Sequence, residues 1–171
     1  GFVACSESAR QSDTKVVENG QIRLVFATKP VPYLKELRQV QSQKNLLPEP
    51  ADQNLFTLEV SQAEDRNLTV ESLSAKKGSI RVSRDKKGQN IMIRFTGLGP
   101  ESDIQVNLRG VLGKDEPIVR WSIKFDNPGR QKIVTVRFPY VAAVPAIGSP
   151  DDDFIVAPAF PGAMIENPAK N

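Results

Sequence analysis

The sequence contains no histidine among its 171 residues. Without an imidazole, the chain cannot form a Ser-His-Asp or Cys-His nucleophile system, an imidazole metal site or the commonest general base near neutral pH. Any chemistry within the chain would have to rest on carboxylate, lysine or tyrosine side chains. We assign no catalytic residue, metal site or cofactor to the chain itself.

Aromatic residues and runs of one charge are also scarce. Phe, Trp and Tyr make up 6% of the chain, which is thin for a platform that stacks sugar rings or nucleic-acid bases. The net charge is +3, and Lys and Arg alternate with Asp and Glu along the sequence. Because no basic stripe with aromatic partners can be found, we predict no nucleic-acid partner.

The single cysteine, Cys5, has an informative position. It follows Phe2-Val3-Ala4 and precedes a polar stretch, an arrangement that resembles the end of a bacterial lipoprotein signal, where the cysteine is lipidated. The positively charged start and the long apolar region of such a signal are absent. The alternative is a chance cysteine in an N-terminal tail.

A lipidated Cys5 would make residues 1–14 a tail and linker, and the domain would begin at residue 15. No other stretch of the sequence is long and apolar enough to span a bilayer. We therefore expect contact with a membrane only through a lipid anchor, and localisation in the cell envelope or outside the cell.

The body of the chain has the alternation of β-strands. Apolar and polar residues alternate over 22–26, 55–60, 79–84, 90–95 and 103–108, and more weakly over 68–70. The segment 85–89 separates two of these stretches and carries Gly88, which can adopt a positive φ. This pattern predicts a β-hairpin with its turn at 85–89.

The two clearest strands are 118–125 and 132–140, joined by 126–130 with its Pro-Gly pair. Trp121 lies on the apolar face of the first strand and is predicted to belong to the core. Val134, Val136 and Phe138 are predicted to share one face of the second strand. Antiparallel hairpins with one apolar and one polar face predict an all-β fold, an antiparallel β-sandwich.

Segment 32–40 does not fit this pattern. Leu34, Leu37 and Val40 recur at helical spacing, and the residues between them favour a helix. Taken by itself the segment reads as a short amphipathic helix, although it follows a strand closely. The local pattern leaves helix and strand open.

An acidic run, Asp151 to Asp153, lies near the C-terminal end of the sequence. Glycoside hydrolysis needs two carboxylates about 5–9 Å apart across a sugar, and consecutive residues of an extended chain point to opposite sides. No calcium loop with alternating Asp or Asn and Gly is present. The run therefore reads chiefly as an acidic loop after Pro150.

The order of these signals resembles the N-terminal part of a galactose-mutarotase-like super-sandwich. The resemblance rests on 22–26, 34–37, 44–47, 55–58, 120–123 and 136–139, and above all on Asp152 to Pro158 followed by Gly162 and Asn167-Pro168. The chain is similar to a group of bacterial secreted proteins in which such a sandwich precedes a glycosidase-type (β/α)8 barrel. The resemblance implies that 34–40 is a strand and that 15–171 belongs to a longer protein, with the super-sandwich incomplete at its C-terminus.

Sugar mutarotases of this fold use histidines, so mutarotase activity is not expected. The resemblance implies a non-catalytic, carbohydrate-associated β-sandwich domain that accompanies a glycoside hydrolase-type catalytic domain. Its expected partners are a polysaccharide or oligosaccharide and that catalytic domain. The expected ligand-binding residues are Tyr140, Asp152, Asp153, Phe160 and Asn167. The alternative function is a structural or protein-binding module of the cell envelope.

Overall fold

The computed structural model describes residues 13–47, 54–61, 66–101, 103–129 and 131–140, together with the backbone of 154–157 and 163–166. Every strand in these ranges pairs antiparallel with its neighbours, and the helical content of the same ranges is one short 3-10 helix, η2 (Ser72–Ser74). The predicted all-β fold is therefore confirmed. No helix in the described part of the chain is both long and apolar enough to cross a membrane.

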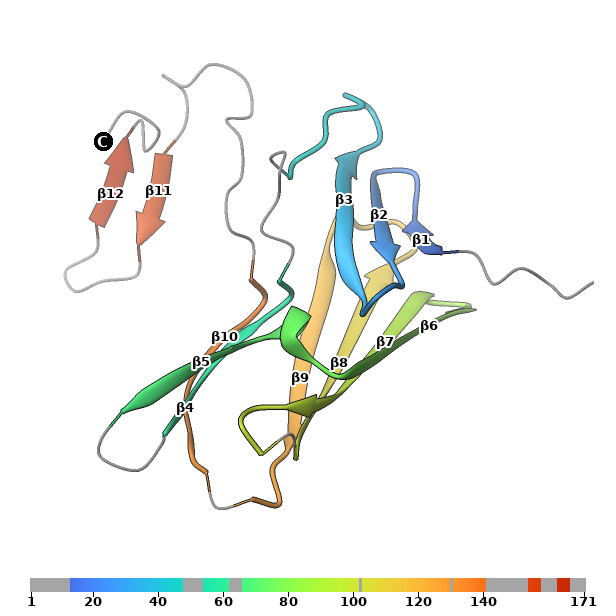
Figure 1. Cartoon of the computed structure of the whole chain (residues 1–171). Helices are drawn as coiled ribbons and strands as arrows, with labels where there is room; N and C mark the ends of the chain where they lie inside the picture. The colour runs from blue at the N-terminus through green and yellow to red at the C-terminus, as the bar shows by residue number, and fades with distance from the viewer. Residues whose placement is uncertain are drawn as a thin grey trace, which may run out of the picture.

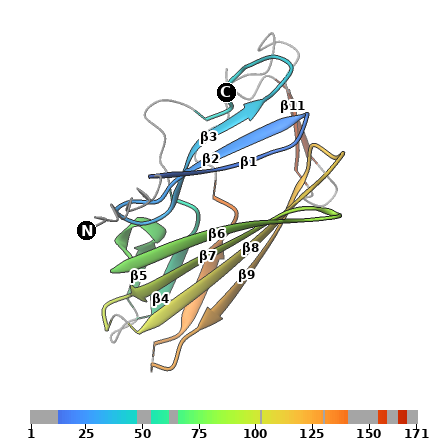
Figure 2. The same cartoon turned by 90° about the vertical axis from the view of Figure 1, so that its right-hand side faces the viewer.

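The strands form two layers. One layer is a four-stranded sheet in the order β6-β7-β8-β9, and the other consists of the sheets β1-β2-β3 and β10-β4-β5, which pack on its inner face. Figure 1 shows the two three-stranded sheets, and Figure 2 shows the four-stranded sheet in front of β4, β5 and β10. This arrangement is an antiparallel β-sandwich. Its strands are β1 (Thr14–Glu18), β2 (Ile22–Ala27), β3 (Tyr33–Gln39), β4 (Thr57–Ser61), β5 (Asn67–Glu71), β6 (Lys77–Asp85), β7 (Gly88–Leu98), β8 (Ile104–Gly113), β9 (Val119–Asp126) and β10 (Ile133–Arg137).

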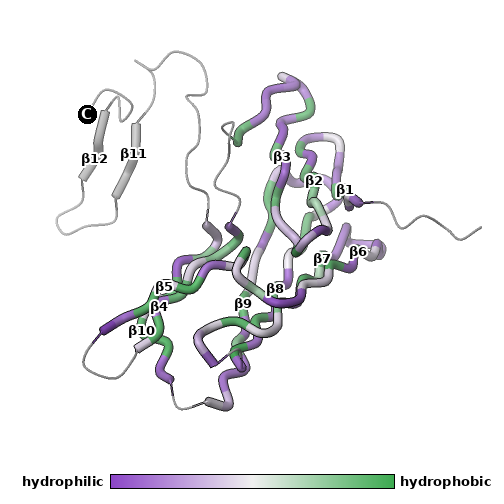
Figure 3. The backbone as a smooth tube through the Cα atoms, viewed as in Figure 1, coloured by the Kyte–Doolittle hydropathy of each residue, from purple (hydrophilic) through white to green (hydrophobic). Residues whose placement is uncertain are grey.

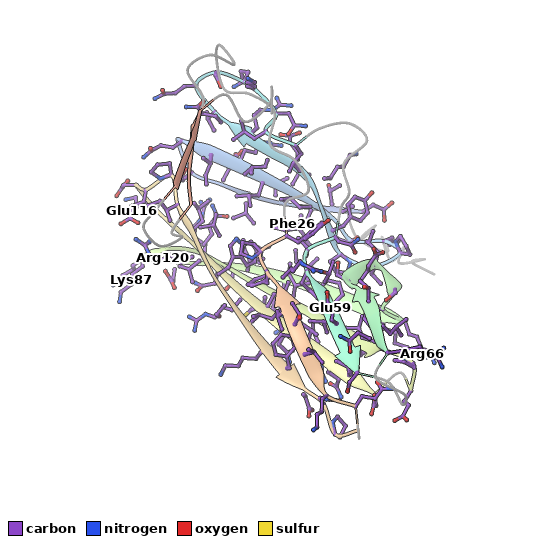
Figure 4. The ribbon with its side chains drawn as sticks, turned by 90° about the vertical axis from the view of Figure 1, so that its left-hand side faces the viewer. Phe26, Glu59, Arg66, Lys87, Glu116 and Arg120 are labelled. Atoms are coloured by element: carbon purple, nitrogen blue, oxygen red, sulfur yellow. The ribbon has the colours of Figure 1, made fainter. Side chains whose placement is uncertain are left out.

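The core lies between the layers and is built from the predicted apolar faces. Phe26, Phe56 and Phe95 are fully buried, and the Phe56 and Phe95 rings meet edge to face with centroids 5.3 Å apart. Trp121 lies 6.4 Å from Phe26 and 6.1 Å from Phe138, ring centroid to ring centroid. Its predicted place in the core is confirmed. Figure 3 shows hydrophobic residues along the strands of both layers, and Figure 4 shows Phe26 between them.

Segment 32–40, for which the local pattern left helix and strand open, contains strand β3. The helical interpretation of its spacing is therefore wrong. Val25 pairs with Glu36 and Phe26 pairs with Leu34, which leaves Lys35 as an extra residue in a β-bulge. The bulge shifts the alternation by one residue, so that Leu34 and Leu37 both pack against the core. A three-residue interval between apolar residues is therefore compatible with a strand.

The predicted hairpin between the last two clear strands is also wrong. β9 pairs with β8, whereas β10 pairs with β4 in the opposite layer, so the segment between them crosses from one sheet to the other. The register of β10 shifts between Ile133 and Thr135. Ile133 and Phe138 consequently pack against the core, while Val134 and Val136 remain 56% and 39% exposed.

The β6–β7 hairpin has the predicted turn. The Asp85 carboxylate accepts hydrogen bonds from the backbone N–H of Lys87 at 2.7 Å and of Gly88 at 3.1 Å, and from the Asn90 side chain at 2.8 Å. Gly88 has φ 148°, which confirms the predicted positive φ. The acid and the glycine together fix the point where the chain reverses.

These hydrogen bonds predict a measurable titration. The Lys87 N–H, the Asn90 side chain and the Gly88 N–H hold the pKa of Asp85 below its ordinary value of 3.8. Because the folded-state pKa is lowered, the carboxylate stabilises the fold above pH 3.8, and this stabilisation is lost as the pH falls through the lower, folded-state pKa. We expect NMR titration of the side-chain carboxyl to give a midpoint below 3.8.

The variant Asn90→Ala should raise this midpoint, because it removes one of the donors. Asn107→Ala removes an exposed amide elsewhere on the same sheet and serves as the control that leaves the midpoint unchanged. A midpoint at or above 3.8 in the unaltered chain would contradict the turn geometry.

Candidate ligand-binding surface

Of the residues predicted to bind a ligand, Tyr140 lies within the described part of the chain. It is half-buried, and its backbone N–H donates to the Leu55 carbonyl at 3.0 Å. Asp152, Asp153, Phe160 and Asn167 lie outside the described residues, as does Cys5. The backbone of β11 (Phe154–Ala157) pairs antiparallel with that of β12 (Ala163–Glu166). The predicted ligand site and the predicted lipidation site therefore stay predictions.

The described residues also contain no group of three or more acidic or cysteine side chains placed to hold a metal ion. The remaining candidates for a site are surface features of the sheets whose charge or shape differs from that of an ordinary polar surface.

The most distinctive of these features is the outer face of the β6–β9 sheet, which we call the basic face. Inward-facing Ile80, Ile93 and Leu108 alternate with outward-facing polar residues along β6, β7 and β8. The antiparallel register then places the outward residues of the four strands side by side. The cations of the basic face are Lys77, Arg81, Arg94, Arg109, Arg120 and Lys124.

Two rows of the basic face cross the sheet from β6 to β9. The first row is Ser79, Arg94, Asn107 and Lys124, and the second is Arg81, Met92, Arg109 and Ser122. All eight side chains are exposed. The carboxylates on this face lie outside the two rows. Asp85 accepts hydrogen bonds within the β6–β7 turn, and Asp126 is the last residue of β9, opposite Gln105 of β8.

Ion pairing distinguishes this face from the other layer. In the β1–β3 sheet Arg23 and Arg38 both contact Glu36, at 3.5 and 3.2 Å between nitrogen and oxygen, and Arg137 of β10 contacts Glu59 at 2.9 Å. Among the described residues, by contrast, Arg81, Arg109 and Lys124 make no ion pair or side-chain hydrogen bond. The two rows therefore carry positive charge that the described part of the chain does not neutralise.

Of the other three cations of the basic face, Lys77 on β6 also makes no ion pair or side-chain hydrogen bond among the described residues, whereas Arg94 and Arg120 have partners. Arg94 donates to the neutral Gln105 side chain at 2.7 Å and so keeps its charge uncompensated. Arg120 pairs with Glu116 at 2.6 Å, at the end of the sheet where Figure 4 also labels Lys87. The uncompensated charge is thus concentrated in the two rows and away from the β8–β9 turn.

The basic face is hollowed at its β6–β8 side. A hollow of about 680 Å³ is lined there by residues of the two rows, by their apolar neighbours Ile80, Val82 and Ile93 on β6 and β7, and by Lys15 of β1. The charged residues in its lining are Lys15, Arg81 and Arg94, all cationic. Asn107 and Ser79 add an amide and a hydroxyl. The hollow can therefore hold an anionic group while donating hydrogen bonds to neutral oxygens.

A second hollow, of about 480 Å³, lies among the β1–β2, β6–β7 and β8–β9 turns. Hydrogen bonds hold these turns together: the Asn19 amide donates to the Gly113 and Glu116 carbonyls, each at 2.8 Å. Its lining mixes Glu18, Asp85 and Asp115 with Arg84, Lys86 and Lys114. Because these charges offset one another, the second hollow has less preference for a ligand of one charge sign than the basic face has.

Comparison with known proteins gives no assignment, because no family model and no curated protein match the chain. The case for a site therefore rests on the basic face itself. Sequence reasoning missed this face because Lys and Arg are dispersed along the chain. The signal that could have found it is a cation at outward positions of each strand from β6 to β9.

Proposed function

We propose that the chain is a non-catalytic, carbohydrate-associated β-sandwich module and that the basic face is its binding surface. The observation that carries the proposal is the pair of rows in which uncompensated cations alternate with side chains such as Asn107, Ser79 and Ser122. Amides, hydroxyls and guanidinium groups are the donors and acceptors that bind sugar hydroxyl and acidic groups. On a broad sheet face, these donors and acceptors can contact several units of a polymer at once.

The proposal extends to the setting of the module. It includes a galactose-mutarotase-like super-sandwich, a glycoside hydrolase-type catalytic domain in the same protein, and localisation in the cell envelope through a lipid on Cys5. The super-sandwich and the catalytic domain rest on the family resemblance, and the lipid anchor rests on the position of Cys5 after Phe2-Val3-Ala4. The absence of histidine from the whole sequence supports the non-catalytic role.

A second candidate function, a structural or protein-binding envelope module, has its own supporting observation. β9 and β10 are edge strands of their sheets, and Phe125, Val134 and Val136 on them are 36%, 56% and 39% exposed. Exposed apolar residues on unpaired edges favour contact with another polypeptide. A partner protein that binds these edges without any saccharide would support this alternative.

Binding of soluble polysaccharides to the intact chain tests the first proposal. We expect affinity electrophoresis or calorimetry to detect binding, and the triple variant Arg81→Gln, Arg109→Gln, Lys124→Gln to weaken it about tenfold, because each exposed ion pair contributes about 0.2–1 kcal/mol. The matched control is Lys35→Gln, Lys114→Gln, Lys132→Gln, which removes the same charge from exposed positions outside the two rows. Equal losses in both variants would contradict the assignment of the basic face.

A further inference from the structure

The two rows of the basic face have a regular pattern of charge. In the first row the cations are on β7 and β9, and in the second they are on β6 and β8. Every cation therefore has an uncharged side chain on the neighbouring strand of its own row. The two rows together form a checkerboard of charged and neutral side chains.

This pattern has a repeat distance set by the sheet. Neighbouring strands are about 4.8 Å apart, so the cations of one row recur at about 9.6 Å. One strand spacing is close to the length of one pyranose unit in an extended saccharide chain. A chain that crosses the strands along a row would therefore place alternate sugars opposite a cation and the sugars between them opposite Ser79, Asn107, Met92 or Ser122.

We propose that the basic face binds an acidic polysaccharide that carries one uronic-acid carboxylate on every second sugar and that runs across the β6–β9 strands. The inference rests on the proposed carbohydrate role and names the ligand class for the same surface. Guanidinium groups pair with carboxylates in a two-point geometry. Carboxylates at the intervening positions would lose hydration next to neutral side chains without gaining a cation.

The basic face is less suited to nucleic acid, the other polyanion that a cationic sheet could bind. Single-stranded nucleic acid is usually held by aromatic side chains that stack on the bases. The outward residues of β6 to β9, all of them described, include no aromatic side chain. The same lack of aromatic residues disfavours neutral glycans, which depend on ring stacking.

The test keeps the charge of the intact chain constant and moves it by one strand. The double variant Arg94→Asn, Asn107→Arg puts a cation next to Lys124 and breaks the alternation of the first row. Calorimetry at 150 mM NaCl would use a hyaluronan decasaccharide, with one carboxylate on alternate sugars, and a polygalacturonate decasaccharide, with one on every sugar. We expect the double variant to bind the hyaluronan probe about tenfold more weakly and to change its polygalacturonate affinity by less than about twofold.

Two single variants provide a check that does not depend on the exchange. Lys124→Gln removes a cation of the first row, and Lys35→Gln removes an exposed cation on β3, in the other layer and outside the basic face. The first should weaken binding of the hyaluronan probe about threefold and the second should leave it unchanged. Circular dichroism melting of each variant reports whether the fold is intact.

The outcomes separate this inference from the proposed function. Unaltered hyaluronan affinity in the double variant, or tighter binding of polygalacturonate than of hyaluronan by the native chain, would overturn the alternating pattern and leave the carbohydrate role in place. Binding only to a neutral glucan probe would overturn the acidic ligand while keeping that role. Binding to none of the saccharides, or tighter binding of a single-stranded DNA probe, would overturn both.

Discussion

Replacing Phe95 by alanine is expected to lower the free energy of unfolding by about 3–5 kcal/mol, the range for large aromatic truncations in a packed core. Phe95 is fully buried on the inner face of β7, and its ring contacts Phe56 from the other layer edge to face. The substitution therefore leaves a cavity between the layers where the two rings meet. Urea denaturation monitored by Trp121 fluorescence measures the effect.

Met92→Ala is the matched control for Phe95→Ala. Met92 lies on the same strand but points outward and is 49% exposed, so its truncation should change the free energy of unfolding by no more than about 0.5 kcal/mol. A loss below about 1 kcal/mol in Phe95→Ala would show that the two layers do not pack against each other as described.

Replacing Gly88 by alanine is expected to cost about 2–4 kcal/mol of stability. Gly88 has φ 148°, and a Cβ atom built on it would lie 2.1 Å from the Leu112 carbonyl oxygen. That oxygen belongs to the backbone of β8, which cannot move without breaking its pairing with β7. The strain must therefore spread into the hairpin and the strand beside it. The measurement is the denaturation midpoint of Gly88→Ala.

Gly20→Ala is the control that separates a local clash from a general effect of adding a methyl group to a turn. A Cβ atom at Gly20 would meet nothing within 4 Å, so this variant should stay within about 0.5 kcal/mol of the native stability. If both glycine variants had the same stability, the close approach of β7 and β8 at Gly88 would be wrong.

Much of the fold was predictable because alternation is a local property of the chain. The alternation predicted over 22–26, 55–60 and 103–108 agrees with the burial of its apolar residues: Phe26, Phe56 and Val106 are all fully buried. The β6–β7 hairpin was predictable for the same reason, since an aspartate and a glycine at the right spacing specify their own turn. None of these features needs knowledge of a distant residue.

The predictions that were wrong concern the pairing of strands and the β-bulges that interrupt it. The spacing in β3 looked helical because Lys35 is bulged, and a bulge is defined only relative to the partner strand. β10 was expected to pair with the strand before it in the sequence, and pairs instead with β4 in the other layer. Short turns usually join adjacent strands, but the turn sequence does not encode whether the chain stays in its sheet.

The candidate site was less predictable than the fold. The predicted ligand residues Asp152, Asp153, Phe160 and Asn167 lie outside the described part of the chain, and Tyr140 is half-buried with its N–H bound to Leu55. The basic face could not be recognised from the sequence, because each of four strands contributes only one or two of its cations. Only the register of those strands makes them neighbours.

The sequence by itself determined the all-β class, the inward and outward faces of most strands, the Gly88 turn and the exclusion of histidine chemistry. Each of these depends on the type of a residue and on its near neighbours. The tertiary structure alone decided which strands are adjacent, and so which charges gather on one face. Gly110 illustrates the difference: a Cβ atom there would lie 2.7 Å from the Trp121 ring, a restriction that arises only because β8 pairs with β9. Strand pairing is chosen by long-range burial of apolar faces, and that choice is a property of the whole chain.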